Sequence, residues 1–127
     1  KECGIKTIII TGRESSAVKK RLLEMKADYI FQNIKVKYEF LKEFMQQNNI
    51  KSEQILYVGD DLNDLSAMTL CDFIACPIDA CKEIKAKSDF ISDKKGGDGA
   101  FRDVIEQMLT KLNLWEDIIS KIYQTGV

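Results

Sequence analysis

The middle of the chain carries the stretch Ile55-Leu56-Tyr57-Val58-Gly59-Asp60-Asp61-Leu62-Asn63-Asp64. A short apolar run, typical of a buried strand, is followed by a glycine and then by three carboxylates within five residues. A carboxylate at a strand end can point into a cleft, and hard cations such as Mg²⁺ prefer carboxylate oxygens. Asp64 comes one helical turn after Asp60, so it can orient a metal-bound water. The triplet therefore indicates a magnesium site, or a turn in which Asp61 and Asp64 cap the next helix. Both can hold together, with Asp60 as the ligand and Asp64 partly as a cap.

On both sides of this stretch, short apolar runs alternate with amphipathic segments. We expect strands at residues 6–11, 29–31, 55–58, 72–75 and 90–91, and helices at residues 15–25, 35–48, 64–70, 80–86, 100–112 and 115–123. Buried strands that alternate with helices imply a mainly parallel sheet with helices on both faces. The sequence therefore predicts a single α/β domain of three layers over residues 1–127, with a helical tail at 113–127. In such sheets, ligands bind at the carboxyl ends of the strands.

Composition narrows the class of protein. The chain has 127 residues, of which 45% are hydrophobic, and 19 basic residues nearly balance 20 acidic ones. This balance gives no support for a nucleic-acid or acidic-membrane partner, and no apolar run approaches the roughly 20 residues that span a bilayer. None of the four cysteines forms a C-x-x-C pair and the chain has no histidine, so the sequence does not predict a zinc site. The cysteines suit a reducing cytoplasm. Catalysis would have to use carboxylates, hydroxyls, lysines or thiols.

The first predicted strand ends in residues suited to an anion. Thr11 offers a hydroxyl and Gly12 a free backbone N–H near a helix start, which favours phosphate, although an ordinary turn is the alternative. Arg13 and Arg21 could face one rim of the same site, or both could be solvated surface residues. Lys37 opens a helix, where the macrodipole disfavours a cation, so an anionic group nearby would explain its position.

In order, Thr11-Gly12-Arg13, Lys37 and the stretch from Gly59 to Asp64 resemble the haloacid dehalogenase superfamily of phosphotransferases. The resemblance implies a Rossmann-like fold and a Mg²⁺ cofactor. It also implies that Thr11 binds phosphate, that Lys37 neutralises an aspartyl-phosphate, and that Asp60 and Asp64 form the acidic pair. Asp60 would be the metal ligand, while Thr11, Lys37 and Asp64 would take part in catalysis.

The same motifs, with Phe31-Gln32 and the loop Gly96-Gly97-Asp98-Gly99, resemble the capless branch of this superfamily. That branch contains phosphatases of 3-deoxy-D-manno-octulosonate 8-phosphate and of nonulosonate 9-phosphates, which serve lipopolysaccharide and sialic acid biosynthesis. It also contains the phosphatase-like domain of acylneuraminate cytidylyltransferases. The resemblance implies a cytoplasmic homotetramer that hydrolyses a phosphorylated acidic sugar. It places Thr11, Gly12, Arg13, Arg21 and Lys37 against the substrate.

The chain departs from the branch in three places. The nucleophile motif Asp-x-Asp, which ends a central strand in the family, does not occur before Thr11. We therefore expect that roughly 50 residues, including that strand, have been lost or cleaved. Asp98 stands where the octulosonate phosphatases usually carry Arg or Lys. Asn33 stands where the family usually has Gly, and Asn tolerates a left-handed backbone.

Two other functions remain open at this point. The first is a non-catalytic oligomerisation domain attached to an acylneuraminate cytidylyltransferase, which the missing nucleophile motif favours. The second is a receiver domain like those of response regulators, which also combines an aspartate cluster with a lysine. In receivers the acidic pair comes early and the lysine late, which is the reverse of the order of Lys37 and Asp60 here.

Overall fold

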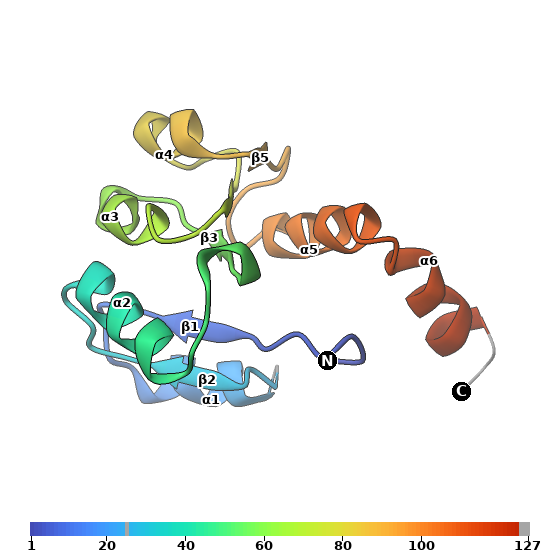
Figure 1. The fold of residues 1–127 in the computed structure, drawn as a ribbon, viewed down its shortest axis with the longest axis horizontal. Coiled ribbons are helices and arrows are strands. Elements are labelled where there is room, and N and C mark those ends of the chain that lie inside the picture. Colours follow the sequence, from blue (N-terminus) through green and yellow to red (C-terminus); the bar gives the residue numbers. More distant parts are fainter. Residues whose placement is uncertain (25, 125–127) are drawn as a thin grey trace.

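The computed structural model describes residues 1–24 and 26–124, without the side chains at positions 18, 21 and 124. Strands β1 (Ile8–Ile10) and β2 (Tyr29–Phe31) form one parallel pair, with Ile9 opposite Ile30. Strands β3 (Leu56–Val58), β4 (Phe73–Cys76) and β5 (Phe90–Ile91) form a second parallel sheet in that order. The predicted α/β class with parallel strands is confirmed (Figure 1).

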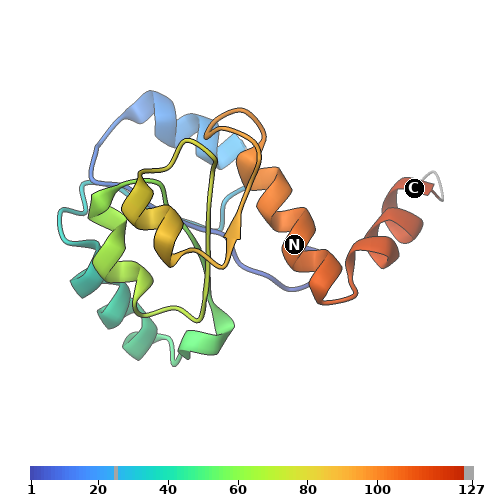
Figure 2. The same cartoon turned by 90° about the horizontal axis from the view of Figure 1, so that it is seen from above.

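The helices follow the predicted order. They are α1 (Ser16–Glu24), α2 (Lys37–Gln47), α3 (Leu65–Met68), α4 (Lys82–Lys87), α5 (Ala100–Lys111) and α6 (Trp115–Ile118), with 3₁₀ turns at Ser52–Gln54 and Leu62–Asp64. The predicted helix at 115–123 is α-helical only at first and continues as a π-helix over Ile119–Gln124. Both views of the ribbon show α6 beyond the end of α5, on the far side from the sheets (Figures 1 and 2).

Several predicted elements are shorter than expected, and in three of them a local hydrogen bond takes the place of regular pairing at one end. The first strand begins at Ile8, since Thr7 instead donates its N–H to the carboxylate of Asp28 at 2.7 Å. The helix predicted at 64–70 ends at Met68. Beyond that residue the backbone hydrogen bonds span three residues instead of four, as when the Leu70 N–H donates to the Ala67 carbonyl. The helix predicted from residue 80 begins at residue 82, because the Cys81 N–H donates to the Asp60 carbonyl.

A gap separates the two sheets. Within the described residues, β1 pairs only with β2 and β3 pairs only with β4, so β1 and β3 each keep one edge without a strand partner. This arrangement is consistent with the expected absence of one central strand. The halves are joined by side chains instead, since Leu41, Ala67 and Cys71 form a buried cluster against which Ile10 of β1 and Tyr57 of β3 pack.

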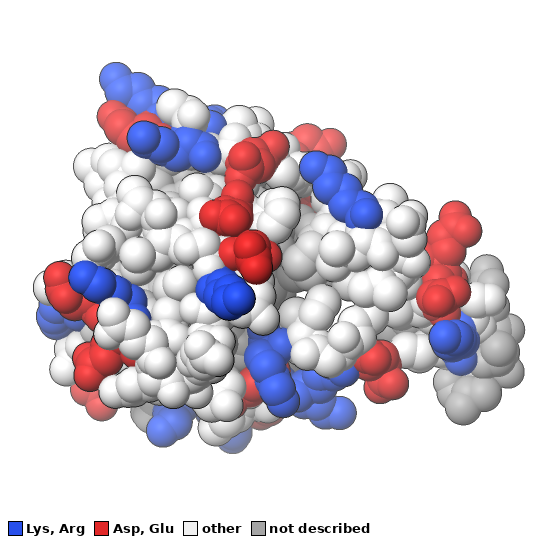
Figure 3. Space-filling model, in the orientation of Figure 1, with Lys and Arg blue, Asp and Glu red and all other residues white. Residues whose placement is uncertain are grey.

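The charged side chains on the surface are mixed in sign. Acidic and basic side chains are interspersed on the face shown in Figure 3, in line with the near-zero net charge. None of the helices in the described part of the chain has the length and apolar character that a membrane span requires. All four cysteines are free, with Cys71 and Cys76 buried.

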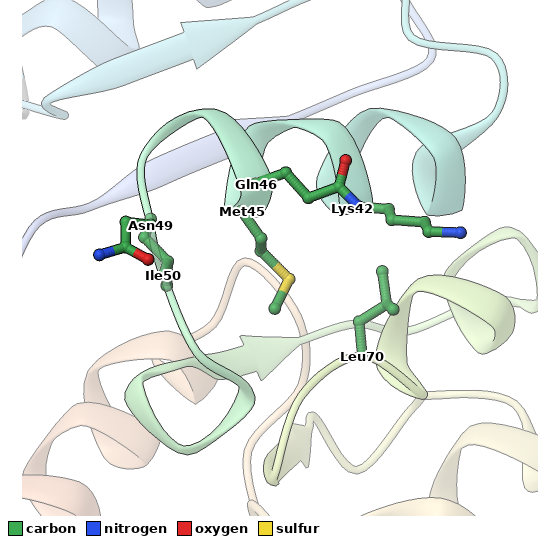
Figure 4. Close-up of a pocket in the computed structure, with 6 residues that line it drawn as sticks. All are labelled: Lys42, Met45, Gln46, Asn49, Ile50 and Leu70. Carbon is green, nitrogen blue, oxygen red and sulfur yellow. The ribbon is translucent and has the colours of Figure 1, made fainter.

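A pocket of about 450 Å³ lies where the end of α2 meets the turn after α3 (Figure 4). Its lining residues are Lys42, Met45, Gln46, Asn49, Ile50 and Leu70. Met45 and Leu70 point toward each other across it (Figure 4). None of the residues that the sequence singles out for function lines this pocket.

Candidate active site

The site is built around one buried carboxylate, that of Asp64. Its Oδ1 accepts hydrogen bonds from Lys37 Nζ at 2.9 Å and from the Tyr57 hydroxyl at 2.7 Å. Its Oδ2 accepts from the backbone N–H groups of Asp60 at 3.0 Å and of Asp61 at 3.3 Å. Asp64 thus shapes the turn after β3 and holds the lysine of α2 against it.

The capping alternative for this turn is confirmed. The Asp61 carboxylate accepts from the Leu62 N–H at 2.7 Å, and Asp61 and Asp64 cap the 3₁₀ turn reciprocally. Such caps satisfy N–H groups that a helix start leaves unpaired. Asp61 and Asp64 are therefore committed to the turn, whereas the side chain of Asp60 is not.

Gly59 is required by the close approach of Asp64. A Cβ atom at position 59 would lie 2.8 Å from the Asp64 Cβ and 2.9 Å from its Cγ. Because Asp64 is held by hydrogen bonds on both oxygens, it cannot move aside at low cost. The glycine lets the strand end pass directly over the carboxylate.

The network sets the protonation of its members. Burial alone would raise the pKa of Asp64, but hydrogen bonds from Tyr57, Lys37 and the Asp60 N–H outweigh it and lower that pKa. Burial, together with the hydrogen bond to Asp64, raises the pKa of Tyr57. At neutral pH the site therefore contains an ionised Asp64, a protonated Tyr57 and a Lys37 ion pair.

Asp60 is the carboxylate available to a ligand. The residue is exposed, and among the described residues its side chain makes no hydrogen bond or ion pair. Desolvation and the negative charges of Asp64 and Asp61 raise its pKa, against the opposing charge of Lys37. An unpaired carboxylate in a surplus of negative charge fits a hard cation such as Mg²⁺.

The rest of a metal site is not present in the described part of the chain. No group of three His, Cys, Asp or Glu side chains there is arranged to hold a metal ion. Asp60 thus fits one ligand position, and other ligands would come from water, from backbone oxygens or from a carboxylate on another segment.

The loop after β1 carries the other residues of the predicted site. The Thr11 Oγ1 accepts from the Arg13 N–H at 3.2 Å, which is the ordinary turn of the alternative interpretation. The Thr11 hydroxyl still has its own proton to donate. Lys35 Nζ donates to the Gly12 carbonyl at 2.7 Å, and the Asn33 N–H donates to the Arg13 carbonyl at 3.0 Å. These bonds fix the loop against the segment between β2 and α2.

The predicted site residues therefore fall into two groups. Lys37, Asp60 and Asp64 lie together, and the anionic neighbour expected for Lys37 is Asp64. In the described residues, no hydrogen bond or ion pair joins this group to Thr11 or Arg13. Arg13 is exposed, while the side chain of Arg21 lies outside the described part of the structure.

Sequence reasoning missed two residues. Tyr57 reads as a core residue of a strand, although a buried tyrosine hydroxyl needs a partner, which is a signal that could have been used. Asp79 follows β4, and its negative charge is among those that raise the pKa of Asp60, after burial and the charges of Asp64 and Asp61. Its position just past a strand end was the available signal.

Comparisons with known proteins identify the family of the chain. A family model of haloacid dehalogenase-like hydrolases matches residues 1–72. The chain is 28% identical over 108 residues to 3-deoxy-D-manno-octulosonate 8-phosphate phosphatase from Haemophilus influenzae, covering 85% of this chain and 60% of that protein. The chain thus spans less than two thirds of the length of this curated relative.

Solved structures show the same likeness. The phosphatase of the same name from Moraxella catarrhalis, in complex with magnesium, phosphate and KDO, has a TM-score of 0.88 at 34% identity. The match covers 94% of this chain and 68% of that one. A probable YrbI family phosphatase from Pseudomonas syringae has a TM-score of 0.92 at 27% identity, covering 99% and 71%.

The family model covers more than half of the chain, and the Moraxella structure adds a relative above 30% identity that is matched over two thirds of its length. The order Thr11, Lys37, Asp60 along the sequence and the α/β fold with parallel strands point the same way. The chain belongs to the haloacid dehalogenase-like hydrolase family, and its relatives there are phosphatases of the 3-deoxy-D-manno-octulosonate 8-phosphate type.

Proposed function

We propose that this chain forms the phosphate- and magnesium-binding part of a phosphatase that acts on a phosphorylated acidic sugar. The observation that carries the proposal is the buried Asp64, which holds the Lys37 ammonium at 2.9 Å and the Asp60 backbone at 3.0 Å. A fixed cation beside a free carboxylate at a strand end suits phosphoryl transfer, where developing charge must be neutralised.

Each residue has a distinct task in this proposal. Asp60 would hold Mg²⁺, which supplies positive charge to the phosphoryl oxygens when it is bound. Lys37 contributes a second positive charge from the other side, oriented by Asp64. Thr11 and the Gly12 N–H donate hydrogen bonds to the phosphate. Arg13 and Arg21 contact the acidic sugar.

The nucleophile belongs to a strand that would fit between β1 and β3. Both strands keep a backbone edge without a partner in the described residues, and an unpaired edge favours the addition of a strand. An aspartate at the end of such a strand would lie next to Asp60. That aspartate would take the phosphoryl group and release it to water, through an aspartyl-phosphate.

The relatives support a candidate substrate for this proposal. The named phosphatases support 3-deoxy-D-manno-octulosonate 8-phosphate as the first candidate. A nonulosonate 9-phosphate, as in sialic acid biosynthesis, is the second, since Asp98 replaces the basic residue usual in the octulosonate enzymes. We propose a cytoplasmic homotetramer as the working form.

A phosphate-release screen of the full-length protein tests this function. The two sugar phosphates are supplied separately, each with Mg²⁺ and with EDTA, and free phosphate is measured. We expect release from one of them only with Mg²⁺. No release from either, together with a nucleotidyltransferase domain in the same polypeptide, would instead establish the non-catalytic oligomerisation domain.

A further inference from the structure

The glycine-rich loop at residues 94–99 is fastened to the segment that follows β4. The Gly96 N–H donates to the Asp79 Oδ1 at 2.8 Å, and the Ile78 N–H donates to the Lys94 carbonyl at 2.9 Å. The base of the loop is held by Ser92, a fully buried residue whose Oγ donates to the Asp103 Oδ2 at 2.6 Å. The loop is therefore anchored at its base and near its tip, and the near-tip anchor is a side chain.

The same segment touches the candidate active site. Two residues after Asp79, the Cys81 N–H donates to the Asp60 carbonyl at 3.0 Å. A continuous path of short contacts thus runs from Asp60 through residues 79–81 to Gly96.

The loop packs against this segment at Gly96 and leaves it at Gly97. A Cβ atom at position 96 would lie 3.6 Å from the Asp79 Oδ1 and 3.7 Å from the Pro77 Cγ, which is van der Waals contact. Gly97 has a φ of +78°, and a Cβ atom there would meet no other atom within 4 Å, so the tip faces open space. Lys94 and Lys95 are both exposed on this loop.

We propose that Asp79 is a positioning residue that latches the 94–99 loop to the rim of the site at Asp60, where the loop closes one side of the substrate pocket. The latch fixes where the charged side chains of the loop, those of Lys94, Lys95 and Asp98, stand relative to Asp60. The lysine ammonium groups among them attract an anionic sugar phosphate. The catalytic consequence rests on the proposed function, whereas the latch itself does not.

Amide hydrogen exchange at Gly96 tests the latch without any activity. In Asp79→Ala the amide loses its acceptor, so its exchange should accelerate by about 10-fold or more. In Asp79→Asn the side-chain oxygen still accepts, so exchange should stay close to wild type. Glu83→Ala, which removes an exposed acid of α4 that makes no side-chain hydrogen bond or ion pair in the described residues, is the control. Equal Gly96 exchange in wild type and Asp79→Ala would overturn the proposal.

Steady-state kinetics of the full-length protein on 3-deoxy-D-manno-octulosonate 8-phosphate test the consequence. Both variants remove the negative charge, so the difference between them isolates the hydrogen bond. We expect Asp79→Ala to raise KM by about 10-fold with little change in kcat, and Asp79→Asn to restore most of the KM. Equal impairment of both variants would show that Asp79 acts by charge alone and would refute a role of the latch in substrate binding. A wild type without phosphatase activity would refute the proposed function and leave the exchange result standing.

Discussion

At the scale of single residues, the buried ion pair of Lys37 and Asp64 sets the energetics of the site. Their side chains are only 12% and 5% exposed. A buried charge that loses its partner keeps the full cost of desolvation, which makes breaking such a pair far more damaging than breaking a surface pair. The ion pair therefore stabilises the fold and also fixes the position of the Lys37 ammonium.

Replacing Asp64 with Asn should destabilise the protein by about 3 kcal/mol, because the Lys37 ammonium is left without a countercharge. Urea unfolding measures the free energy. Asp61→Asn is the matched control, since Asn still accepts from the Leu62 N–H and no buried charge is involved. Equal free energies of unfolding for the two variants would contradict the role given to Asp64.

The pH dependence of the free energy of unfolding should include a contribution from Asp64. The folded pKa of Asp64 lies below the ordinary value of 3.8. Its contribution is therefore fully present above pH 3.8 and is lost as the pH falls through the lower, folded pKa. Unfolding measured from pH 6 down to about pH 3 should show a smaller acid loss in Asp64→Asn than in wild type. Identical pH profiles would show that Asp64 does not titrate in this way.

At the scale of elements, the end of β3 and the turn after it act as one unit. Gly59 allows Asp64 to fold back under the strand end, and Asp61 caps the 3₁₀ turn that follows. The position of Asp60 depends on this unit, because the Asp60 N–H is bonded to Asp64.

Gly59→Ala should displace Asp64 and cost about 1–3 kcal/mol of stability, as overpacking does in a tight core. Gly12→Ala is the comparison, since a Cβ there would meet only the Ile34 carbonyl at 3.4 Å. The free energy of unfolding is measured for both variants. If Gly59→Ala loses no more stability than Gly12→Ala, the close packing of Asp64 against Gly59 is contradicted.

Much at this scale could be predicted from the sequence. Strands 29–31 and 90–91 are confirmed as they were predicted, because apolar β-forming residues bounded by turns leave few alternatives. Asn33 takes a φ of 59°, as its replacement of glycine implied. Periodicity alone could not identify the partners of Tyr57 and Asp79, since it reports only which face of an element is buried.

At the scale of the whole molecule, the two sheets are joined by packing rather than by strand pairing. The cluster of Leu41, Ala67 and Cys71 brings β1 and β3 into one body, while each keeps an unpaired edge in the described residues. The candidate site lies at the end of β3, so a strand added in the gap would complete both the sheet and the site. Nothing in residue patterns alone could place that gap, which was inferred from the family resemblance.

Asp60 is the proposed magnesium ligand of the phosphatase site. In the full-length protein, Mg²⁺-dependent release of phosphate from 3-deoxy-D-manno-octulosonate 8-phosphate or a nonulosonate 9-phosphate should be abolished by Asp60→Asn. Asp61→Asn should retain it, because Asp61 caps the turn and an Asn preserves the cap. Activity retained in Asp60→Asn at the level of Asp61→Asn would contradict the claim.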